Sequence, residues 1–268
     1  MSEHQYFAAN EKDEVEFKRL RLLEETYDPN TIRYMEKLGL KKGWDCLEIG
    51  AGAGSIANWL AAQVGPSGKV VATDIDTRLL RHLNAVNIEV RQHDILKDAL
   101  EMNKYDLAHC RLLLMHLPEP EKALKRMVNA IRPGGWLLIE ELDLSSELSI
   151  DTTNPSAASF VRTRQIIFDA NQKKGTIDPF LGRRVRGLLE QSRLTDVNNE
   201  GWTYIGRGGN TPEAQLRRRT MQVTAKPLVT AGILTQEQYE NTLRMYEDPS
   251  FYFLTATTFS AWGRKPAK

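Results

Sequence analysis

The sequence predicts an α/β fold in which a mostly parallel sheet carries helices on both faces. Three features support this: short apolar runs alternate with amphipathic stretches, a glycine-rich loop follows the first run, and glycine or proline turns separate the segments. Repeated strand–helix units of this kind need both faces of their sheet covered. The 268 residues are enough to bury a full core without disulfides or a structural metal.

The first half of the chain contains most of the regular alternation. Residues 13–27 are expected to form a helix, which Asp28-Pro29-Asn30 should break before Thr31 opens a second one. Short apolar strands are then predicted at 45–49, 69–74, 88–92, 105–110 and 136–140, with helices at 55–64, 77–84 and 120–131 between them.

After Leu144 the alternation weakens and helical patterns dominate. Helices are predicted at 155–173, 181–193, 212–231 and 235–247, with strands at 197–205 and 251–262. The last two strands are therefore separated by a long, mainly helical segment rather than by a tight turn.

Composition and charge exclude several classes of protein. Lys and Arg total 36 against 35 Asp and Glu, and a net charge of +1 argues against a dedicated nucleic-acid binder. Two cysteines, Cys46 and Cys110, cannot form a disulfide framework or an all-cysteine zinc site, and no metal site is predicted. The N-terminus lacks the apolar core of a signal peptide, and no apolar run approaches the ~20 residues of a membrane span. We therefore expect a cytoplasmic protein that does not enter membranes.

The strongest motif is the stretch Leu47–Gly54, which reads LEIGAGAG. It lies between a strand and a helix, where glycines allow a ligand to approach the backbone and a helix N-terminus favours a negative group. Ser55 stands where a dinucleotide-binding fold would place its third glycine. Taken alone, the motif is also compatible with a simple tight turn.

Two aspartates follow the next two strands. Asp74 ends the second strand, where a carboxylate can accept hydrogen bonds from both hydroxyls of a ribose. Asp94 follows the third strand, where a carboxylate can accept from an exocyclic adenine amine. The alternative for Asp74 or Asp76 is a cap on the following helix, and for Asp94 a loop or cap role.

Together these residues resemble the class I S-adenosylmethionine-dependent methyltransferases. The resemblance covers the core from Gly39 to Leu144, and its subgroup is the small-molecule type related to ubiquinone and menaquinone biosynthesis. The matching stretches, in the order of the family, are Leu47–Gly54, Val70–Asp76, His93–Ile95, Tyr105–Leu117 and Arg132–Glu140. The resemblance implies a Rossmann-like, seven-stranded, mostly parallel sheet and S-adenosylmethionine as the cofactor.

The resemblance also implies roles for individual residues. Glu48 would fix the glycine loop and a water or amine near the methionine part of the cofactor. The backbone of Gly50, Ala51 and Gly52 would touch the cofactor, and Asp74 would hold the ribose. Ile75 and the Ile95 amide would contact the adenine ring, and Asp94 would bind the adenine amine. Cys110 and Arg111 would lie beside the methionine part. Tyr6 and Arg19 would close over the cofactor.

Methyl transfer from a sulfonium mainly requires an in-line nucleophile and exclusion of water, sometimes with a base. The candidate bases are His116, Glu141 and Asp143, which follow the fourth and fifth strands. The alternatives are a histidine satisfied by backbone and two solvated loop acids. His109, inside the fourth strand, is expected to pack or hydrogen-bond there. The sequence lacks both the histidine that some O-methyltransferases carry after the fifth strand and an Asn-Pro-Pro-Tyr loop.

The predicted organisation is a single methyltransferase domain over residues 1–268. Residues 1–38 would form an N-terminal helical lid, 39–145 the cofactor core, and 146–195 and 206–250 helical insertions that cap the substrate. The acceptor would be a small, partly apolar molecule, bound by a monomer or homodimer. Two alternatives remain: a protein of this fold that binds the cofactor without methylating, and a nicotinamide-dependent oxidoreductase, which the Gly-x-Gly-x-Gly form and Asp94 disfavour.

Two further groups of residues bear on the acceptor. Seven aromatic residues either line an apolar pocket or fill the core: Phe160, Phe168, Phe180, Trp202, Tyr204, Phe251 and Phe253. The run Arg217-Arg218-Arg219 is either a solvated helix face or the source of one arginine that holds an anionic substrate.

Overall fold

The computed structural model describes residues 13–151, 156–175 and 177–267. Contacts between Cα atoms divide the chain into two compact units. The sheet unit comprises Tyr27–Glu141, Leu181–Glu200 and Phe259–Lys268, and the helical unit comprises the chain up to Thr26 with Leu142–Phe180 and Gly201–Thr258. Each unit is described by itself.

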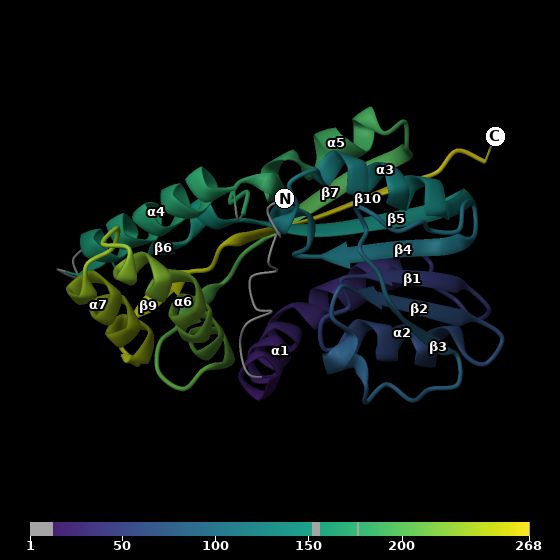
Figure 1. Ribbon diagram of the computed structural model, residues 1–268. Helices are drawn as coiled ribbons and strands as arrows, with labels where there is room; N and C mark the ends of the chain where they lie inside the picture. The colour runs from purple at the N-terminus through teal and green to yellow at the C-terminus, as the bar shows by residue number, and fades with distance from the viewer. Residues whose placement is uncertain (1–12, 152–155, 176, 268) are drawn as a thin grey trace. The chain divides into compact units, whose positions relative to one another are not determined.

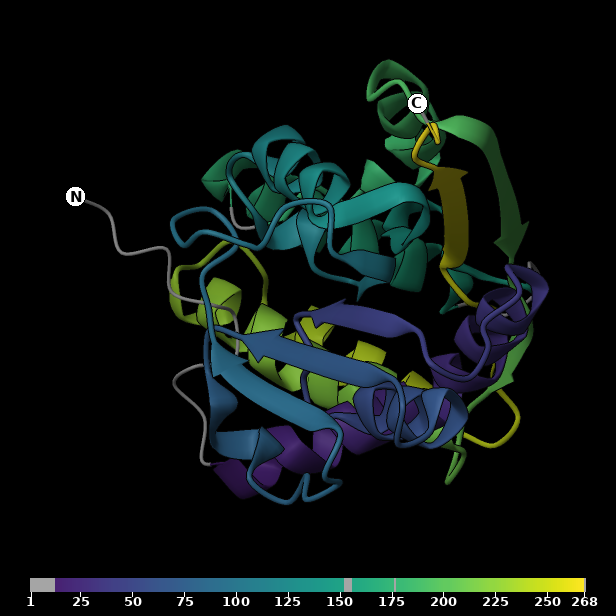
Figure 2. The ribbon, with the colours of Figure 1, turned by 90° about the vertical axis from the view of Figure 1, so that its right-hand side faces the viewer.

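The sheet unit contains a seven-stranded sheet with the order β3-β2-β1-β4-β5-β10-β7 (Figure 1). The pairs β1–β2, β2–β3, β1–β4 and β4–β5 are parallel, and β1, β2 and β3 lie side by side in Figure 2. The strands are β1 Asp45–Ile49, β2 Lys69–Asp74, β3 Ile88–Gln92, β4 Tyr105–Arg111, β5 Ile131–Asp143, β7 Thr195–Trp202 and β10 Thr257–Arg264. The predicted fold class, with its seven-stranded and mostly parallel sheet, is confirmed.

Helix α1, Asp13–Lys37, precedes the first strand. Helices and short turns follow between the strands: α2 Ser55–Val64, η1 Thr77–Leu80, η2 Leu114–His116, α3 Pro120–Ala130, η4 Leu181–Arg184 and α5 Val185–Gln191. Helix α2 buries Ile56, Leu60 and Val64 and packs on β1 and β2, while α3 buries Leu124 and Met127 and packs on β4. These apolar faces have the helical spacing seen in the sequence.

Helix α1 corrects the prediction of two helices, because it continues through Pro29 to Lys37. Proline removes one backbone hydrogen bond and normally breaks a helix interior. Tertiary contacts hold this turn instead: Asp28 accepts a hydrogen bond from Arg111 at 2.8 Å, and Thr31 donates one to the buried Glu140. Long-range bonds of this kind have no signal in the local sequence.

Two elements near the strand ends also differ from prediction. The helix expected at 77–84 is only the 3₁₀ turn η1, Thr77–Leu80. Further along, the Asn87 side chain donates to the carbonyls of Ala61 and Gly65 at the end of α2. Strand β5 starts at Ile131 rather than at residue 136. Gly134, with φ of +79°, lies at an irregularity in the β4–β5 pairing and lets the strand continue through the expected turn.

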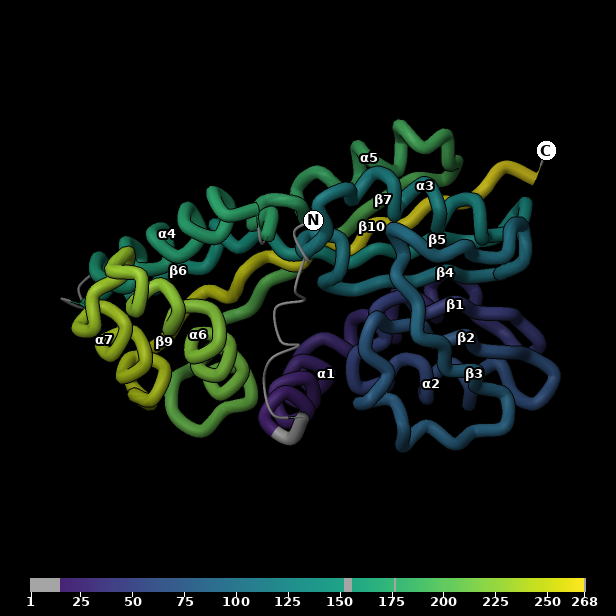
Figure 3. The backbone as a smooth tube through the Cα atoms, in the orientation of Figure 1, coloured from purple at the N-terminus to yellow at the C-terminus, as the bar shows by residue number. Residues whose placement is uncertain are grey.

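The helical unit contains a small antiparallel sheet that the sequence did not predict. Its order is β6-β9-β8, from β6 Leu148–Ser149, β8 Ile205–Arg207 and β9 Tyr252–Leu254. The unit also contains η3 Leu144–Ser146 and the helices α4 Ala157–Lys174, α6 Pro212–Thr230 and α7 Gln236–Glu247. Helices α6 and α7 lie side by side (Figure 3).

The two last predicted strands are each split, which corrects the prediction of continuous strands at 197–205 and 251–262. The first becomes β7 and β8, the second becomes β9 and β10, and the members of each pair belong to different sheets. The split points are hydrogen-bonded to each other. Thr203 Oγ1 donates to the Thr255 carbonyl at 2.7 Å, and the Thr255 amide donates to the Tyr204 carbonyl at 3.0 Å.

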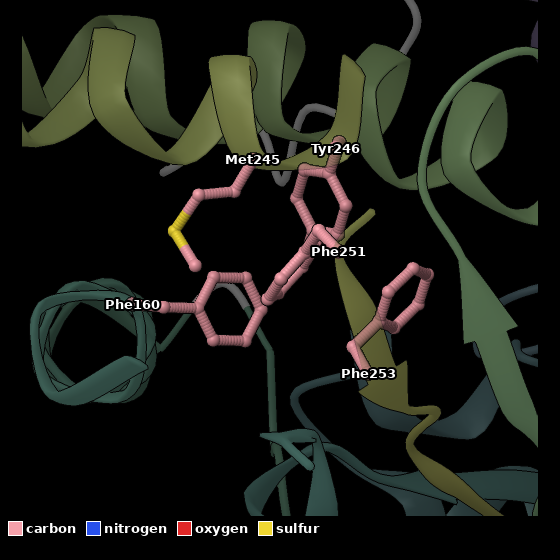
Figure 4. Packing of buried hydrophobic residues seen from close by; sticks show 5 residues of the cluster. All are labelled: Phe160, Met245, Tyr246, Phe251 and Phe253. Atoms are coloured by element: carbon pink, nitrogen blue, oxygen red, sulfur yellow. The ribbon is translucent and has the colours of Figure 1, made fainter. Parts of the chain in front are cut away.

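Aromatic residues fill the interior of the helical unit. Phe160 of α4, Met245 and Tyr246 of α7, and Phe251 and Phe253 form one buried cluster with mainly edge-to-face ring contacts (Figure 4). Of the seven aromatic residues considered for a pocket, Phe160, Phe168, Phe251 and Phe253 are therefore core residues. Trp202 and Tyr204 are half-buried and stack on each other at 6.1 Å.

Candidate functional site

The glycine loop adopts a backbone that other residues rarely reach. Gly50, Gly52 and Gly54 have φ angles of +71°, +58° and +85°. A Cβ on Gly50 would lie 3.3 Å from the Leu113 side chain, and one on Gly54 only 2.8 Å from Leu83. The amides of Gly50 and Ala51 both donate to the Thr73 carbonyl, at 2.8 and 3.0 Å. The loop is therefore fixed against the end of β2.

Asp74 joins the end of β2 to this loop. Its Oδ2 accepts from the Gly52 amide and its Oδ1 from the Asp76 amide, both at 3.0 Å. Burial raises the pKa of Asp74, and the amides of Asp76, Gly52 and Ile75 oppose that shift. A carboxylate can accept about four hydrogen bonds, so Asp74 keeps acceptor capacity for a ribose hydroxyl. Capping of the following turn, the alternative considered for Asp74 or Asp76, is the role of Asp76, whose side chain accepts from the Arg78 amide.

Ile75 and the segment after β3 lie at neighbouring strand ends. Ile75 is 43% exposed beside Asp74, and Gln92 donates to its carbonyl at 3.2 Å. Asp94 accepts from the Leu96 amide at 2.9 Å and pairs with Lys97 at 2.9 Å. Burial opposes ionisation of Asp94, but Lys97 and the amide hold its pKa below the usual range. Asp94 thus stabilises its own loop, as one alternative expected, and Ile95 is buried.

A row of buried ionisable groups crosses three adjacent strands. His109 of β4 places Nδ1 2.8 Å from Oε2 of Glu48 on β1 and Nε2 3.2 Å from Oε2 of Glu140 on β5. All three side chains are buried. Burial opposes the charged imidazole, but the two carboxylates raise the pKa of His109 to about 9. His109 is packed and hydrogen-bonded at its position in β4 as expected, whereas its pairing with Glu48 and Glu140 on the neighbouring strands was not foreseen.

Arg111 and Cys110 point in different directions, because side chains alternate along a strand. Arg111 donates to Asp28 at 2.8 Å and to Thr31 Oγ1 at 2.7 Å, both on α1. The Cys110 thiol is fully buried, and burial raises its pKa well above the ordinary value. The guanidinium of Arg111 is therefore directed at α1.

The loop after β4 is held by a carboxylate. Leu112 has φ of +52°, unusual for leucine, and the amides of Leu113 and Leu114 donate to Glu141 Oε1 at 3.0 and 2.7 Å. Glu141 lies inside β5 and is buried, so it is not the solvated loop acid considered above. His116 ends the following turn and is half-buried, with its amide donating to the Leu113 carbonyl at 3.0 Å.

The other predicted site residues lie outside the sheet unit. Asp143 ends β5, is buried, and caps η3 by accepting from the Ser145 amide at 3.1 Å, so it is not a solvated acid either. Arg19 pairs with Glu16 on α1. Tyr6 falls outside the described residues.

Within the described residues, no group of three or more His, Cys, Asp or Glu side chains is arranged to hold a metal ion. None of the helices in this part of the chain is long and apolar enough to cross a bilayer.

The strand order, the glycine loop and the acid at the end of β2 define a Rossmann-like methyltransferase fold. Comparison with known families agrees: a family model described as a methyltransferase domain matches residues 18–192. The chain therefore belongs to the methyltransferase-domain family, and the class predicted from the sequence is confirmed.

Two named relatives are similar to parts of the chain. Methyltransferase str2 of Strobilurus tenacellus is 34% identical over 188 residues, covering 69% of this chain and 66% of the relative. The ubiquinone/menaquinone biosynthesis C-methyltransferase UbiE of Hahella chejuensis is 32% identical over 115 residues, 40% of this chain and 46% of that protein. The chain thus spans two thirds or less of the length of these two relatives.

Among solved structures, phosphoethanolamine N-methyltransferase 2 of Haemonchus contortus, in complex with S-adenosyl-L-methionine, matches with a TM-score of 0.59. Its sequence identity is 17%, and the match covers 99% of this chain and 60% of that chain. At this identity the likeness supports the fold.

Proposed function

We propose that this protein is an S-adenosylmethionine-dependent methyltransferase that methylates a small, partly apolar metabolite by in-line displacement. One observation carries the proposal: the Gly52 amide and the Asp74 carboxylate meet at 3.0 Å, which joins the glycine loop to the acid at the end of β2. Family membership and the fold of the chain support the same assignment.

The residues present fit this cofactor. Asp74 keeps acceptor positions for the ribose hydroxyls, and exposed Ile75 offers an apolar surface to the flat adenine. Asp94 and the Ile95 amide are assigned to the adenine edge, and Glu48, Cys110 and Arg111 to the methionine side. The backbone of Gly50, Ala51 and Gly52 supplies close approach because the glycines lack a Cβ. The bound cofactor supplies an activated methyl group on a sulfonium.

The chain must then orient the acceptor and, where needed, remove its proton. We assign the base to His116, because it follows the loop that Glu141 holds in place through two amides. The contacts of Glu141 and Asp143 support roles in shaping this loop and the end of β5. Tyr6 and Arg19 are assigned to the lid over the cofactor.

Acceptor recognition is assigned to residues 146–195 and 206–250, which lie beyond the cofactor core. Sequence insertions of this kind commonly set specificity. The nearly neutral net charge supports a small molecule rather than a nucleic acid as acceptor. We assign the protein to the cytoplasm as a monomer or homodimer.

Calorimetric titration with S-adenosylhomocysteine and, separately, NAD tests the cofactor. Micromolar binding of the first ligand and none of the second is expected. A folded sample that binds only NAD would overturn the proposal in favour of an oxidoreductase. Acceptor screening with a labelled methyl donor then separates a methyltransferase from a protein that binds the cofactor without methylating.

The base is tested by replacing one histidine at a time. His116→Ala should lower turnover with a responsive acceptor while leaving affinity for S-adenosylhomocysteine nearly unchanged. His82→Ala, at an exposed position after η1, is the matched control and should keep full turnover. Equal turnover in both variants would remove His116 from the mechanism.

A further inference from the structure

We propose that His109 is a positioning residue that, as a doubly protonated imidazolium, holds the Glu48 carboxylate ready for the amino group of the cofactor. The inference rests on the proposed function, because that function places the methionine part near Glu48. It concerns a side chain to which the cofactor assignment gave no role.

The hydrogen-bond geometry requires two protons on the ring. Both nitrogens of His109 face carboxylate oxygens, at 2.8 Å from Glu48 and 3.2 Å from Glu140. Ionised carboxylates only accept hydrogen bonds, and a neutral imidazole has a single N–H to donate. An imidazolium between two carboxylates satisfies both contacts, and each of these bonds is then charge-assisted.

Glu140 is the fixed end of the hydrogen-bond series Glu48–His109–Glu140. Its Oε1 accepts from Ser260 of β10 at 2.6 Å, and its Oε2 accepts from both Thr31 of α1 and His109. Burial opposes ionisation of this carboxylate, but His109, the charge of Arg111 and the bond from Ser260 hold the pKa of Glu140 below its usual range. The position of Glu140 therefore fixes the ring of His109.

Glu48 is the free end of the same chain of bonds. It lies in β1, two residues before Gly50, and its side chain is only 5% exposed. Among the described residues, His109 is the hydrogen-bond partner of its Oε2, whereas Oε1 makes no hydrogen bond and is not among the fully buried atoms that lack a partner. An accessible carboxylate oxygen can accept a hydrogen bond from an ammonium group, and that bond is charge-assisted.

The other charged groups of this region are already paired. Arg111, on the same side of β4 as His109, bonds Asp28 and Thr31 of α1. Three carboxylates, those of Glu48, Glu140 and Asp28, thus face two cations, His109 and Arg111, which leaves one negative charge in the cluster. That charge favours a cationic ligand group beside Glu48.

Nuclear magnetic resonance of ¹⁵N-labelled histidine tests the protonation directly on the wild-type protein. At pH 7 both ring nitrogens of His109 should carry a proton, with His109→Gln used to assign the signal. Loss of a proton should occur near pH 9, where the pKa of His109 lies. One unprotonated ring nitrogen at pH 7 would overturn the proposal, whether or not any variant folds.

Ligand binding tests the positioning role. S-adenosylhomocysteine carries the amino-acid part, and 5′-methylthioadenosine carries the adenosine without it. In His109→Gln the amide nitrogen can still reach Glu140 but not Glu48, so affinity for S-adenosylhomocysteine should fall about tenfold or more. Affinity for 5′-methylthioadenosine should stay unchanged. His109→Asn places its amide nitrogen where Nδ1 stood and should restore part of the loss.

The outcomes are distinguishable. A wild-type protein that fails to bind S-adenosylhomocysteine contradicts the proposed function itself. Wild-type binding with an unchanged His109→Gln affinity contradicts the role of His109. An equal loss for both ligands in that variant also contradicts it, because a merely structural role would disturb the adenosine site as well.

Discussion

The two units of the molecule bury ionisable groups in opposite ways. In the sheet unit, two carboxylates flank one imidazole: Glu48, Glu140 and His109. In the helical unit, two arginines surround one carboxylate: Arg164 lies 2.8 Å and Arg217 3.8 Å from Glu147. Both clusters are buried, so neither is an ordinary surface ion pair.

The difference shows how similar groups serve distinct purposes. Glu147 joins the segment before β6 to α4 through Arg164, to α6 through Arg217 and to α7 through Tyr246, whose hydroxyl donates to it at 2.6 Å. Its oxygens face the elements they connect, which is the pattern of a structural anchor. The sheet cluster instead leaves one oxygen of Glu48, near the glycine loop, without a hydrogen bond from any residue that the structure describes, which is the pattern of a binding site.

Removing the charge of Glu147 should have the largest effect on the free energy of unfolding. Glu147→Gln leaves two buried arginines without their carboxylate, and breaking a buried pair in this way costs about 3–5 kcal/mol. Urea unfolding should show this loss of stability. Affinity of the folded fraction for S-adenosylhomocysteine should be retained, because the assigned cofactor residues of the core lie in the sheet unit. A stability change below about 1 kcal/mol would contradict the anchor role.

Asp74→Ala should affect the cofactor rather than the fold. The variant leaves the ribose hydroxyls unpaired, and calorimetry should show a loss of about 1–3 kcal/mol in binding of S-adenosylhomocysteine. Asp76→Ala is the matched control, since the side chain of Asp76 caps η1. It should bind the ligand more tightly than Asp74→Ala does. An unchanged affinity in folded Asp74→Ala would refute the ribose assignment.

The two clusters should respond to opposite ends of the pH scale. The pKa of His109 is raised from 6.5 to about 9, so its contribution is complete below pH 6.5 and is lost as pH rises through 9. The pKa of Glu147 is lowered by its arginines against the effect of burial, so its contribution is present above pH 4.5 and is lost on acidification.

Thermal unfolding of the wild type from pH 3 to pH 10 measures both effects. His109→Gln should flatten the alkaline side of the stability profile, and Glu147→Gln should flatten the acid side. The same flattening on both sides in either variant would show that the clusters are not independent.

The smallest effect on stability should come from substitution of Arg218, which follows the buried Arg217. Arg218 pairs with Glu247 on the surface, with the two side chains 44% and 45% exposed. Exposed pairs of this kind contribute 0–1 kcal/mol at most, so Arg218→Ala should unfold at about the same urea concentration as the wild type. Destabilisation comparable to that of Glu147→Gln would mean that the whole arginine run supports the core.

The sequence predicted what local patterns determine. The glycine loop and Asp74 could be located because backbone conformation and strand ends leave a signal in glycine spacing and apolar runs. The continuous α1 could not, because Pro29 is tolerated through bonds to side chains far along the chain. The split of the last strands also escaped prediction, since the hydrogen bonds that join the split points link residues 51 and 52 positions apart in sequence.

The buried triad shows the same limit within the site. His109 and Arg111 occupy alternate positions of β4, and that spacing is a signal that two polar groups share one face. Their partners lie on other elements, between 31 and 83 residues away in sequence. Only the order of the strands brings Glu48 and Glu140 to the two sides of one histidine.

The paired break at Thr203–Tyr204 and Thr255 has a consequence for how such a protein diversifies. Residues 205–254 form a segment whose flanking residues are joined by direct hydrogen bonds. The two ends of the segment therefore lie close together. Such a segment can be replaced without changing the order of the strands that precede and follow it, provided that the replacement keeps the partners of Glu147. If residues 206–250 recognise the acceptor, as proposed, recombination at this junction would change the acceptor and leave the cofactor core as it is.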